Sequence, residues 1–592
     1  MLPAARWVSL LVNLLASKHP GVDLTRVPVI GKLMDRILRW RAFQFIIILP
    51  NQILFWLVLT TGLVGGTLLP ESHQTKIIHF GAASILPLGT NAGSSGTVPN
   101  LFRSALADTW LRPNFSTVIT WWLWWCLVWL LMATVGRGWC AVCPFGGFAE
   151  WIQRRSLWKR RHRNVGLGLR WPRTLVRYGI LPAVAAFVIL TFIEEYFNIS
   201  ASGDPFTTGL LVAVIITLAL VMHLIFERRT FCTYLCPLTA VFAPLGATGV
   251  IAGFRAREPD RCLTCPTKDC LRGGNRGYEC PWYEWPGNAT SNAMCGLCSE
   301  CYKACPYDNV GLYAQAPLDS VVNPGHRRGD IALAAIIVLG VVAFFTINAT
   351  FTYTNVDLWL NGLTGWAHYP NPVDYLGIII SVLVMFVIAV ALVAGVAGSG
   401  TSTRATQIQA GTDTTPDEIV PDEIVPDTPI LNGHVGNIAG APRTMPRVGS
   451  VVARVRTLFV PLAYGIIPLI TADLLANRTP TFLFYAPRII EAVSDPFGRG
   501  WNLFGTTHLK VVSSHLASFT WGGHSSSALD AQLVIVCLGV IASIWSTHRI
   551  FRKELAQLSS RPMLGEIAAI AMVLVCGVLM AWLYIAIGGL AT

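Results

Sequence analysis

Long apolar segments recur along the whole chain and alternate with polar loops that are rich in Lys and Arg. A helix of about 20 apolar residues is long enough to cross a hydrocarbon core of about 30 Å. We therefore predict a polytopic α-helical membrane protein with about nine transmembrane helices. The predicted spans are residues 42–66, 115–135, 177–197, 206–226, 330–350, 373–397, 456–475, 530–547 and 566–588.

The basic residues predict the orientation of these spans. With an inner N-terminus and nine spans, the inner segments contain 37 of the 44 Lys and Arg residues. This asymmetry follows the positive-inside rule and places the N-terminus in the cytoplasm. The net charge of +12 is then a consequence of topology, and it is no evidence for binding of nucleic acid.

Composition divides the chain into six parts. A stretch with the tandem sequence "PDEIVPDEIVPDTP" is polar and interrupted by Pro, so we predict a disordered linker there. The predicted parts are an amphipathic cytoplasmic N-terminus (1–41), a four-helix membrane domain (42–226), a cytoplasmic loop domain (227–328), two transmembrane helices (329–397), the linker (398–455), and a three-helix C-terminal module (456–592) with an outer segment (476–529).

The loop domain contains ten of the fifteen Cys residues, and the eight from Cys262 to Cys305 form two groups. The second group runs Cys-x2-Cys-x2-Cys-x3-Cys-Pro, from Cys295 to Pro306, which is the spacing of bacterial ferredoxins that bind [4Fe–4S] clusters. In two-cluster ferredoxins the fourth Cys of such a run binds the other cluster. A crosswise assignment therefore predicts two clusters in a ferredoxin-like domain. The predicted ligands are Cys262, Cys265, Cys270 and Cys305 for the first cluster, and Cys280, Cys295, Cys298 and Cys301 for the second.

Two structural zinc sites are the alternative for these eight Cys residues, because zinc also uses CxxC pairs. A three-Cys run closed by Cys-Pro is uncommon in zinc sites and favours iron–sulfur clusters. Disulfides are not expected, because the predicted topology places the thiols in a reducing compartment.

Two further Cys pairs lie where predicted spans end. Cys140 and Cys143 follow the second span in "GRGWCAVCP", and Cys232 and Cys236 follow the fourth span in "RRTFCTYLCP". Both spans run from outside to inside, so all four thiols are predicted at the inner membrane surface. They form either a third metal or redox site or a set of buried structural thiols.

These two Cys-Pro motifs, followed by a two-cluster loop, resemble the NapH/NosR/CcoG group of membrane polyferredoxins. The resemblance covers residues 42–315. It implies a helical bundle with [4Fe–4S] clusters that moves electrons in the cytoplasmic (inner) membrane of a prokaryote. The chain departs from the group in three ways, one of which is that no outer flavin-binding domain is visible. Its first pair has the spacing CxxC in place of CxxxC, and spans five to nine are not part of the common core of the group.

The resulting hypothesis is a membrane-bound electron-transfer protein in contact with lipid. It would shuttle electrons between a soluble ferredoxin-like donor, a quinol or the quinone pool, and a membrane or periplasmic redox partner. Whether it is an oxidoreductase subunit stays open, since no substrate pocket is legible. The alternatives are a metal-handling factor for metalloenzyme assembly and a redox sensor or scaffold subunit. Haem is not expected, because His223 is the only His well inside a span. Flavin is not expected either, because no flavin-binding domain is visible.

Overall fold

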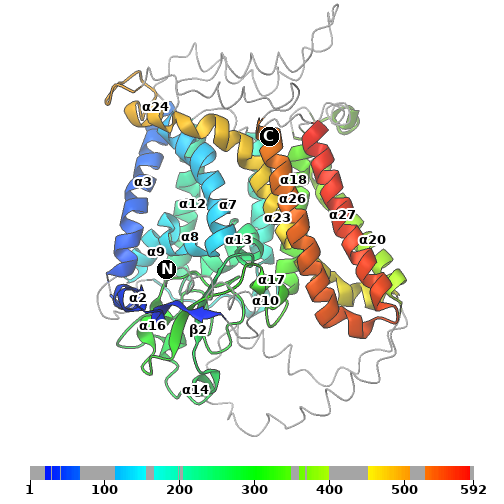
Figure 1. Cartoon of the computed structure of the whole chain (residues 1–592). Coiled ribbons are helices and arrows are strands. Elements are labelled where there is room, and N and C mark those ends of the chain that lie inside the picture. The colour runs from blue at the N-terminus through cyan, green and yellow to red at the C-terminus, as the bar shows by residue number, and fades with distance from the viewer. Residues whose placement is uncertain are drawn as a thin grey trace, which may run out of the picture.

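The computed structural model of the chain (Figure 1) describes most of the predicted spans and the whole loop domain. The described residues are 21–28, 30–40, 42–66, 114–154, 166–197, 199, 205–348, 359–366, 370–398, 451–506 and 527–586. Residues 1–20, most of the predicted linker 398–455 and the part of the outer segment from 507 to 526 lie outside them.

Eight helices in the described part of the chain are long and apolar enough to cross a membrane. They are α3 (Phe43–Gly66), the continuous run of α6 (Phe115–Thr117), η3 (Val118–Trp124) and α7 (Trp125–Val135), then α12 (Pro205–Ile225), α18 (Gly329–Asn348), α20 (Pro372–Ala397), α23 (Val451–Tyr485), α26 (Ser527–Ile550) and α27 (Pro562–Ala586).

The remaining predicted span, 177–197, forms a shorter helix. This helix is α11 (Leu181–Tyr196), which is apolar but has only 16 residues. At 1.5 Å per residue it is about 24 Å long, whereas a hydrocarbon core is about 30 Å thick. Eight of the nine predicted spans therefore coincide with helices of sufficient length. The other one, the third span, coincides with a helix that is too short by about one turn.

Helix α23 lies at the centre of the long helices and packs against α7, α18, α20 and α26. Its interior positions Ala463, Ile466 and Ile467 are fully buried. Small residues permit this close packing, because Gly465 lies against Thr547 and Gly539 lies against Ala472. The sequence places spans seven to nine in a separate module, whereas in the structure they share one core with the first half of the chain.

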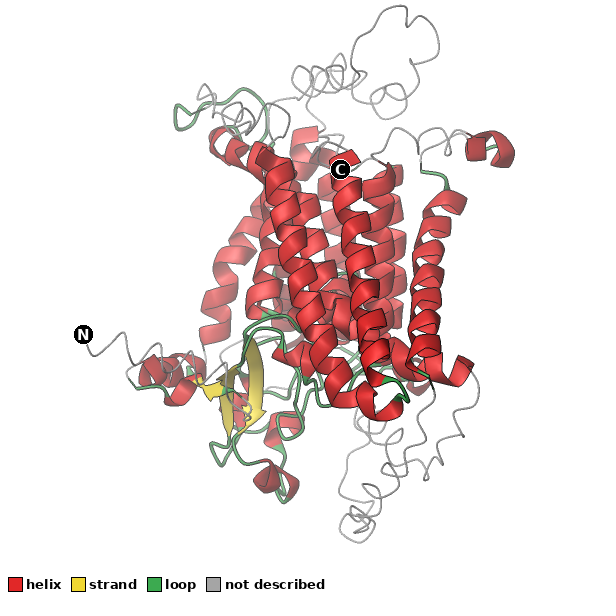
Figure 2. Ribbon diagram, turned by 45° about the vertical axis from the view of Figure 1, so that its right-hand side comes forward, coloured by secondary structure: helices red, strands yellow, loops and turns green. Residues whose placement is uncertain are grey.

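The loop domain contains a three-stranded antiparallel sheet at one end of the long helices, the end opposite α24 (Ile489–Ser494) (Figures 1 and 2). The strand order is β1 (Val22–Asp23), β3 (Val310–Ala314), β2 (Ile251–Ala256). Residues from the N-terminus therefore complete a sheet whose other strands come from the loop domain. The other elements near this end are α2 (Ile30–Arg39), α8 (Gly138–Val142), α9 (Pro144–Arg154), α10 (Arg173–Val176), η4 (Phe231–Leu235), α13 (Thr239–Gly246), α14 (Pro259–Leu263), α15 (Asp269–Arg272), α16 (Glu300–Ala304) and α17 (Asp319–Val322).

Candidate metal centre

The first predicted ligand set lies around one pocket of the loop domain. Cys262, Cys265, Cys270 and Cys305 all line this pocket. Asn309 connects the two ends of the set, because its backbone N–H donates to Cys305 Sγ (3.3 Å) and its Nδ2 donates to Cys262 Sγ (3.4 Å). The fold thus places Cys305 with the group that begins at Cys262. The role of these thiols as cluster ligands stays a prediction.

The second predicted set lies deeper in the domain. Cys280, Cys298 and Cys301 are at most 6% exposed, and the thiol of Cys301 is within electrostatic reach of Cys280, Cys298 and Cys295. Burial raises the pKa of Cys298 to about 12. A thiol binds metal as the thiolate, and a bound metal itself supplies the positive charge that favours this form. The two sets adjoin, since the backbone N–H of Cys280 donates to the carbonyl of Cys270 (3.1 Å).

The backbone between the Cys residues of the second set is strongly curved. Leu297 and Ser299 both have positive φ angles, 52° and 64°, which residues other than glycine rarely adopt and which concentrate at functional sites. Gly296 lies against the buried indole of Trp282, where a Cβ atom would be 2.1 Å from Nε1. Only glycine fits at this position of the run, so the loop and Trp282 fix each other.

The four thiols at the ends of the spans also meet. Cys140 lies in α8 with Cys143 directly after it, and Cys232 lies in η4 with Cys236 directly after it. The thiol of Cys232 is within electrostatic reach of the other three. Burial, together with neighbouring thiols of the group, raises the pKa of Cys143 to about 11 and that of Cys236 to about 12. We call these four residues the thiol quartet.

The unequal spacing of the two Cys pairs has a structural explanation. Helix α8 is α-helical, whereas η4 is a π-helical turn whose wider winding takes up one more residue. Beyond each turn the second Cys has almost the same backbone conformation, with φ −59° and ψ 123° at Cys143 and φ −60° and ψ 119° at Cys236. The extra residue of the CxxxC motif is therefore absorbed locally, and both motifs end in the same way.

Two arginines that the sequence reasoning missed occupy equivalent places in these motifs. Each precedes the first Cys of its pair by three residues, as Arg137 in "RGWC" and Arg229 in "RTFC". The residue before each has positive φ, 82° at Gly136 and 56° at Arg228.

Each arginine is joined by hydrogen bonds to the Cys motif of the other. Arg229 Nη1 donates to the carbonyl of Cys140 (2.7 Å). Arg137 Nη2 donates to Thr239 Oγ1 (3.1 Å), which in turn donates to the carbonyl of Cys232 (2.6 Å). The recurrence of R-x-x-C was the signal in the sequence that could have identified both residues.

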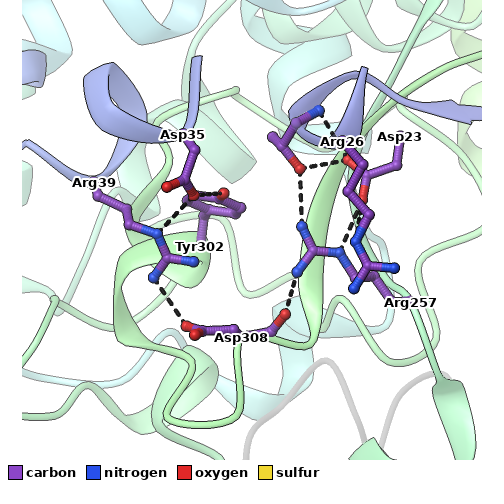
Figure 3. A network of polar contacts seen from close by, with 8 residues as sticks. Asp23, Arg26, Asp35, Arg39, Arg257, Tyr302 and Asp308 are labelled. Carbon is purple, nitrogen blue, oxygen red and sulfur yellow. Dashed lines mark hydrogen bonds and ion pairs between the residues drawn. The ribbon is translucent and has the colours of Figure 1, made fainter. Parts of the chain in front are cut away.

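Residues 22–39 form polar contacts with the loop domain (Figure 3). Tyr302, between Cys301 and Cys305, donates to Asp35 of α2, and Arg39 bridges Asp35 (2.7 Å) and Asp308 (2.9 Å). Arg257 of the loop domain donates to Asp23 Oδ2 (2.8 Å) and to Thr25 Oγ1 (2.8 Å). Residues 22–39 therefore belong structurally to the loop domain, which the sequence division at residue 41 did not indicate.

Other candidate ligands contribute less. The Nδ1 atom of His223 is 2.7 Å from the carbonyl of Ala219 in its own helix. Among the residues that the structure describes, no three or more His, Cys, Asp or Glu side chains converge on a point that suits one metal ion.

Comparison with known proteins identifies the relatives of this arrangement. A family model described as a 4Fe-4S binding domain matches residues 117–165 and 208–254. The ferredoxin-type protein NapH of Escherichia coli (strain K12) is 26% identical over 179 residues, which are 28% of this chain and 58% of that protein. The resemblance to NapH-type polyferredoxins is confirmed. The chain thus spans 58% of the length of the curated relative it matches. No solved structure matches.

The two matched segments each contain one Cys pair of the quartet, and neither contains any of the eight Cys residues of the loop. One family model therefore matches two parts of the chain that are built alike, each with a span, an R-x-x-C sequence and a Cys-Pro ending. The comparisons support iron–sulfur binding, a multi-pass membrane protein and a part in electron transfer.

Proposed function

We propose that this chain is an iron–sulfur protein of the cytoplasmic membrane of a prokaryote that carries electrons between a soluble donor or the quinone pool and a redox partner in or beyond the membrane. Two [4Fe–4S] clusters would be held by the two four-Cys sets, and the quartet would hold a third metal or redox centre. The observation that carries the proposal is the meeting of Cys262, Cys265 and Cys270 with the sequence-distant Cys305 around one pocket.

The donor set suits this cofactor. Each set offers four thiols, and the backbone and side chain of Asn309 supply N–H donors to two of the sulfurs in the first set. Such N–H···S bonds stabilise thiolates and help to set the potential of a bound cluster. A cluster supplies one-electron transfer at this place. The protein residues hold its ligands, exclude water from the second set and keep the two sets adjacent.

The strand pairing supports the proposed topology. Val22 pairs with Ala314 and Asp23 with Tyr313, so strand β1 and the loop domain would lie on the same side of the membrane. An even number of crossings must separate them, and among the residues that the structure describes α3, α6–α7 and α12 are long enough to cross, which makes three. We therefore infer that the short helix α11 makes the fourth crossing. Together with the Lys and Arg asymmetry, this supports a cytoplasmic N-terminus and a cytoplasmic iron–sulfur domain.

The decisive experiment is anaerobic purification of the full chain in detergent with iron, acid-labile sulfide and zinc analysis, followed by EPR of the reduced protein. We expect broad visible absorbance and two distinguishable reduced-cluster signals. Zinc in place of iron, or the absence of both EPR signals, contradicts the proposal. Rapid oxidation of the reduced protein by a soluble quinone analogue is the expected sign of exchange with the quinone pool.

A metal-handling role is the second candidate, and it is favoured by the quartet itself, which provides four thiols outside both loop sets. Copper binding that is lost in a Cys232→Ser, Cys236→Ser variant, while both cluster signals persist, supports this role. Retention of copper by that variant contradicts it.

A further inference from the structure

Two buried arginines lie between the second Cys set and the thiol quartet. Arg137 and Arg229 are each 1% exposed, and both guanidinium groups face the ring of Trp282, at 4.6 and 5.7 Å from its centroid. Trp282 in turn packs against Gly296 of the second Cys set. The two arginines and this indole therefore form a layer that separates the two groups of thiols, and we call it the arginine layer.

The layer contacts the backbone beside the second set, and its charge reaches thiols of both groups. The backbone N–H of Arg229 donates to the carbonyl of Pro281, next to Cys280 (3.3 Å), and its guanidinium lies within electrostatic reach of Cys232 and Cys298. Arg137 Nη1 donates to the carbonyl of Ala293 (3.2 Å), two residues before Cys295. The charge of Arg229 therefore acts on both the second set and the quartet, whereas Arg137 acts on Cys236 of the quartet and lies against the backbone that leads into the second set.

The charge of Arg229 is partly balanced. Arg229 shares Glu150 with Arg154, at 2.5 and 2.6 Å, and all three side chains are buried. Glu279 and Glu300 also act on Arg154, although Glu300 is paired with Lys303 (2.9 Å).

The charge of Arg137 is not balanced in this way. Its side chain donates only to neutral atoms, the carbonyl of Ala293, Met294 Sδ and Thr239 Oγ1, and no carboxylate in the described residues forms an ion pair with it. Glu284 lies within electrostatic reach of Arg137 without forming an ion pair with it, and it also acts on Cys280 and Cys295 of the second set. A buried cation without a counter-charge is unfavourable, so this position suits an anionic partner beside it.

The first Cys set has no comparable layer. Its neighbouring cations are Arg261, which is exposed and lies over the ring of Tyr307, and Lys268, which is half-buried over the ring of Trp285. Water and salt screen charges at such surface positions, whereas they screen buried charges much less. The electrostatic environments of the two sets therefore differ in strength.

We propose that Arg137 and Arg229 make the second set the preferred place for an electron, so that electrons move inward from the partly exposed first set towards the quartet. The proposal rests on the proposed function, since it requires a cluster at each set. One electron leaves the reduced first cluster, which is thereby oxidised, and enters the oxidised second cluster, with no bond made or broken. The buried positive charges stabilise the added negative charge on the second set, which raises its potential above that of the first.

The test is an EPR-monitored redox titration of the full chain and of the variants Arg229→Gln, Arg137→Gln and Arg229→Lys. Each titration follows both cluster signals, and the first cluster is identified by its loss in Cys305→Ser. In the unaltered protein, the second cluster should be reduced at the higher potential. Removing either charge should lower the ratio of reduced to oxidised second cluster at a fixed potential by on the order of tenfold, about 59 mV for a one-electron couple.

The matched variants separate charge from structure. Arg229→Lys keeps the charge and should retain most of the original potential, whereas Glu150→Gln removes a negative charge and should shift the potential in the opposite direction. Arg261→Gln, at the surface beside the first set, should leave the second cluster unchanged. Variants are compared only where both cluster signals are intact. If Arg229→Gln does not assemble both clusters, the potential measured in Arg137→Gln tests the proposal.

This inference is overturned if both EPR signals remain and the potential of the second cluster is unchanged or raised in Arg137→Gln. It is also overturned if the first cluster is the more easily reduced one in the unaltered protein. Absence of the signals from the unaltered protein is the separate result that overturns the proposed function.

Discussion

The two four-Cys sets of the loop domain contain the same chemical groups in very different surroundings. The first set lines a pocket beside α14, the element that lies farthest from the long helices, and its Cys265 and Cys270 are partly exposed (Figure 1). The second set is enclosed by α16, Trp282 and the span-end motifs, and most of its thiols are buried. The two sets offer the same thiol ligands but differ in exposure. The open first set therefore suits electron exchange with a soluble partner, and the enclosed second set suits electron transfer towards the membrane.

The strongest test of this contrast removes one ligand from each set. Cys301→Ser should lose about half of the iron and should also unfold at lower temperature, since the altered side chain lies in the interior of the domain. Cys265→Ser should also lose about half of the iron but leave the unfolding temperature nearer to that of the unaltered chain. Iron analysis and thermal unfolding of both variants measure the difference. Equal destabilisation by the two changes would contradict the contrast.

A second test concerns the boundary between the sets. Cys305 follows the second run in sequence but lies with Cys262 in space, joined to it by Asn309. Cys305→Ser should therefore remove the same EPR signal as Cys262→Ser and spare the signal that depends on Cys298. Loss of the signal that depends on Cys298 would break the crosswise assignment.

The enclosed region should also respond to acid in its own way. Burial opposes ionisation of Glu150, but Arg154 and Arg229 outweigh it and lower the pKa of this carboxyl to about 2 from the ordinary 4.5. Glu150→Gln leaves both arginines without their partner and should reduce the free energy of unfolding by about 3–5 kcal/mol at neutral pH.

The pH dependence of that loss has a definite sign. A lowered pKa stabilises the fold above the unfolded value, and this stabilisation is lost as pH falls towards the folded value. The difference between Glu150→Gln and the unaltered chain should therefore be constant from pH 7 to about 5.5 and shrink below pH 4.5. Denaturant titrations in detergent at several pH values measure it, and a difference that grows in acid would exclude the ion pairs as its cause.

The smallest expected effect concerns the N-terminal contact of the loop domain. Asp35→Asn removes the negative charge that faces Tyr302 and Arg39. Because Asp35 is 41% and Arg39 34% exposed, water screens the pair and the expected loss is about 1 kcal/mol or less. Lys32→Gln, on the exposed face of the same helix, serves as the control and should not change the unfolding midpoint.

Local patterns in the sequence predicted the long helices well, because a membrane span is encoded by its own composition. The spacing of Cys295, Cys298 and Cys301 is also a local pattern, and it predicted iron–sulfur ligands in the loop. The position of the N-terminal strand could not be predicted, since two residues carry no periodic signal and their partners come some 290 positions later. Arg137 and Arg229 were missed because each lies in a basic inner loop, where an arginine is usually a topological signal.

The pairing of β1 with β3 also determines the order in which the domain can be completed. β3 leaves the ribosome only after α3 to α13 have been made, so β1 waits without its partner strand while the first half of the chain is inserted. Contacts between such distant residues form late and slowly. The pairing of β1, which is synthesised first, with β3, which is synthesised much later, is therefore the last step in assembling the loop domain.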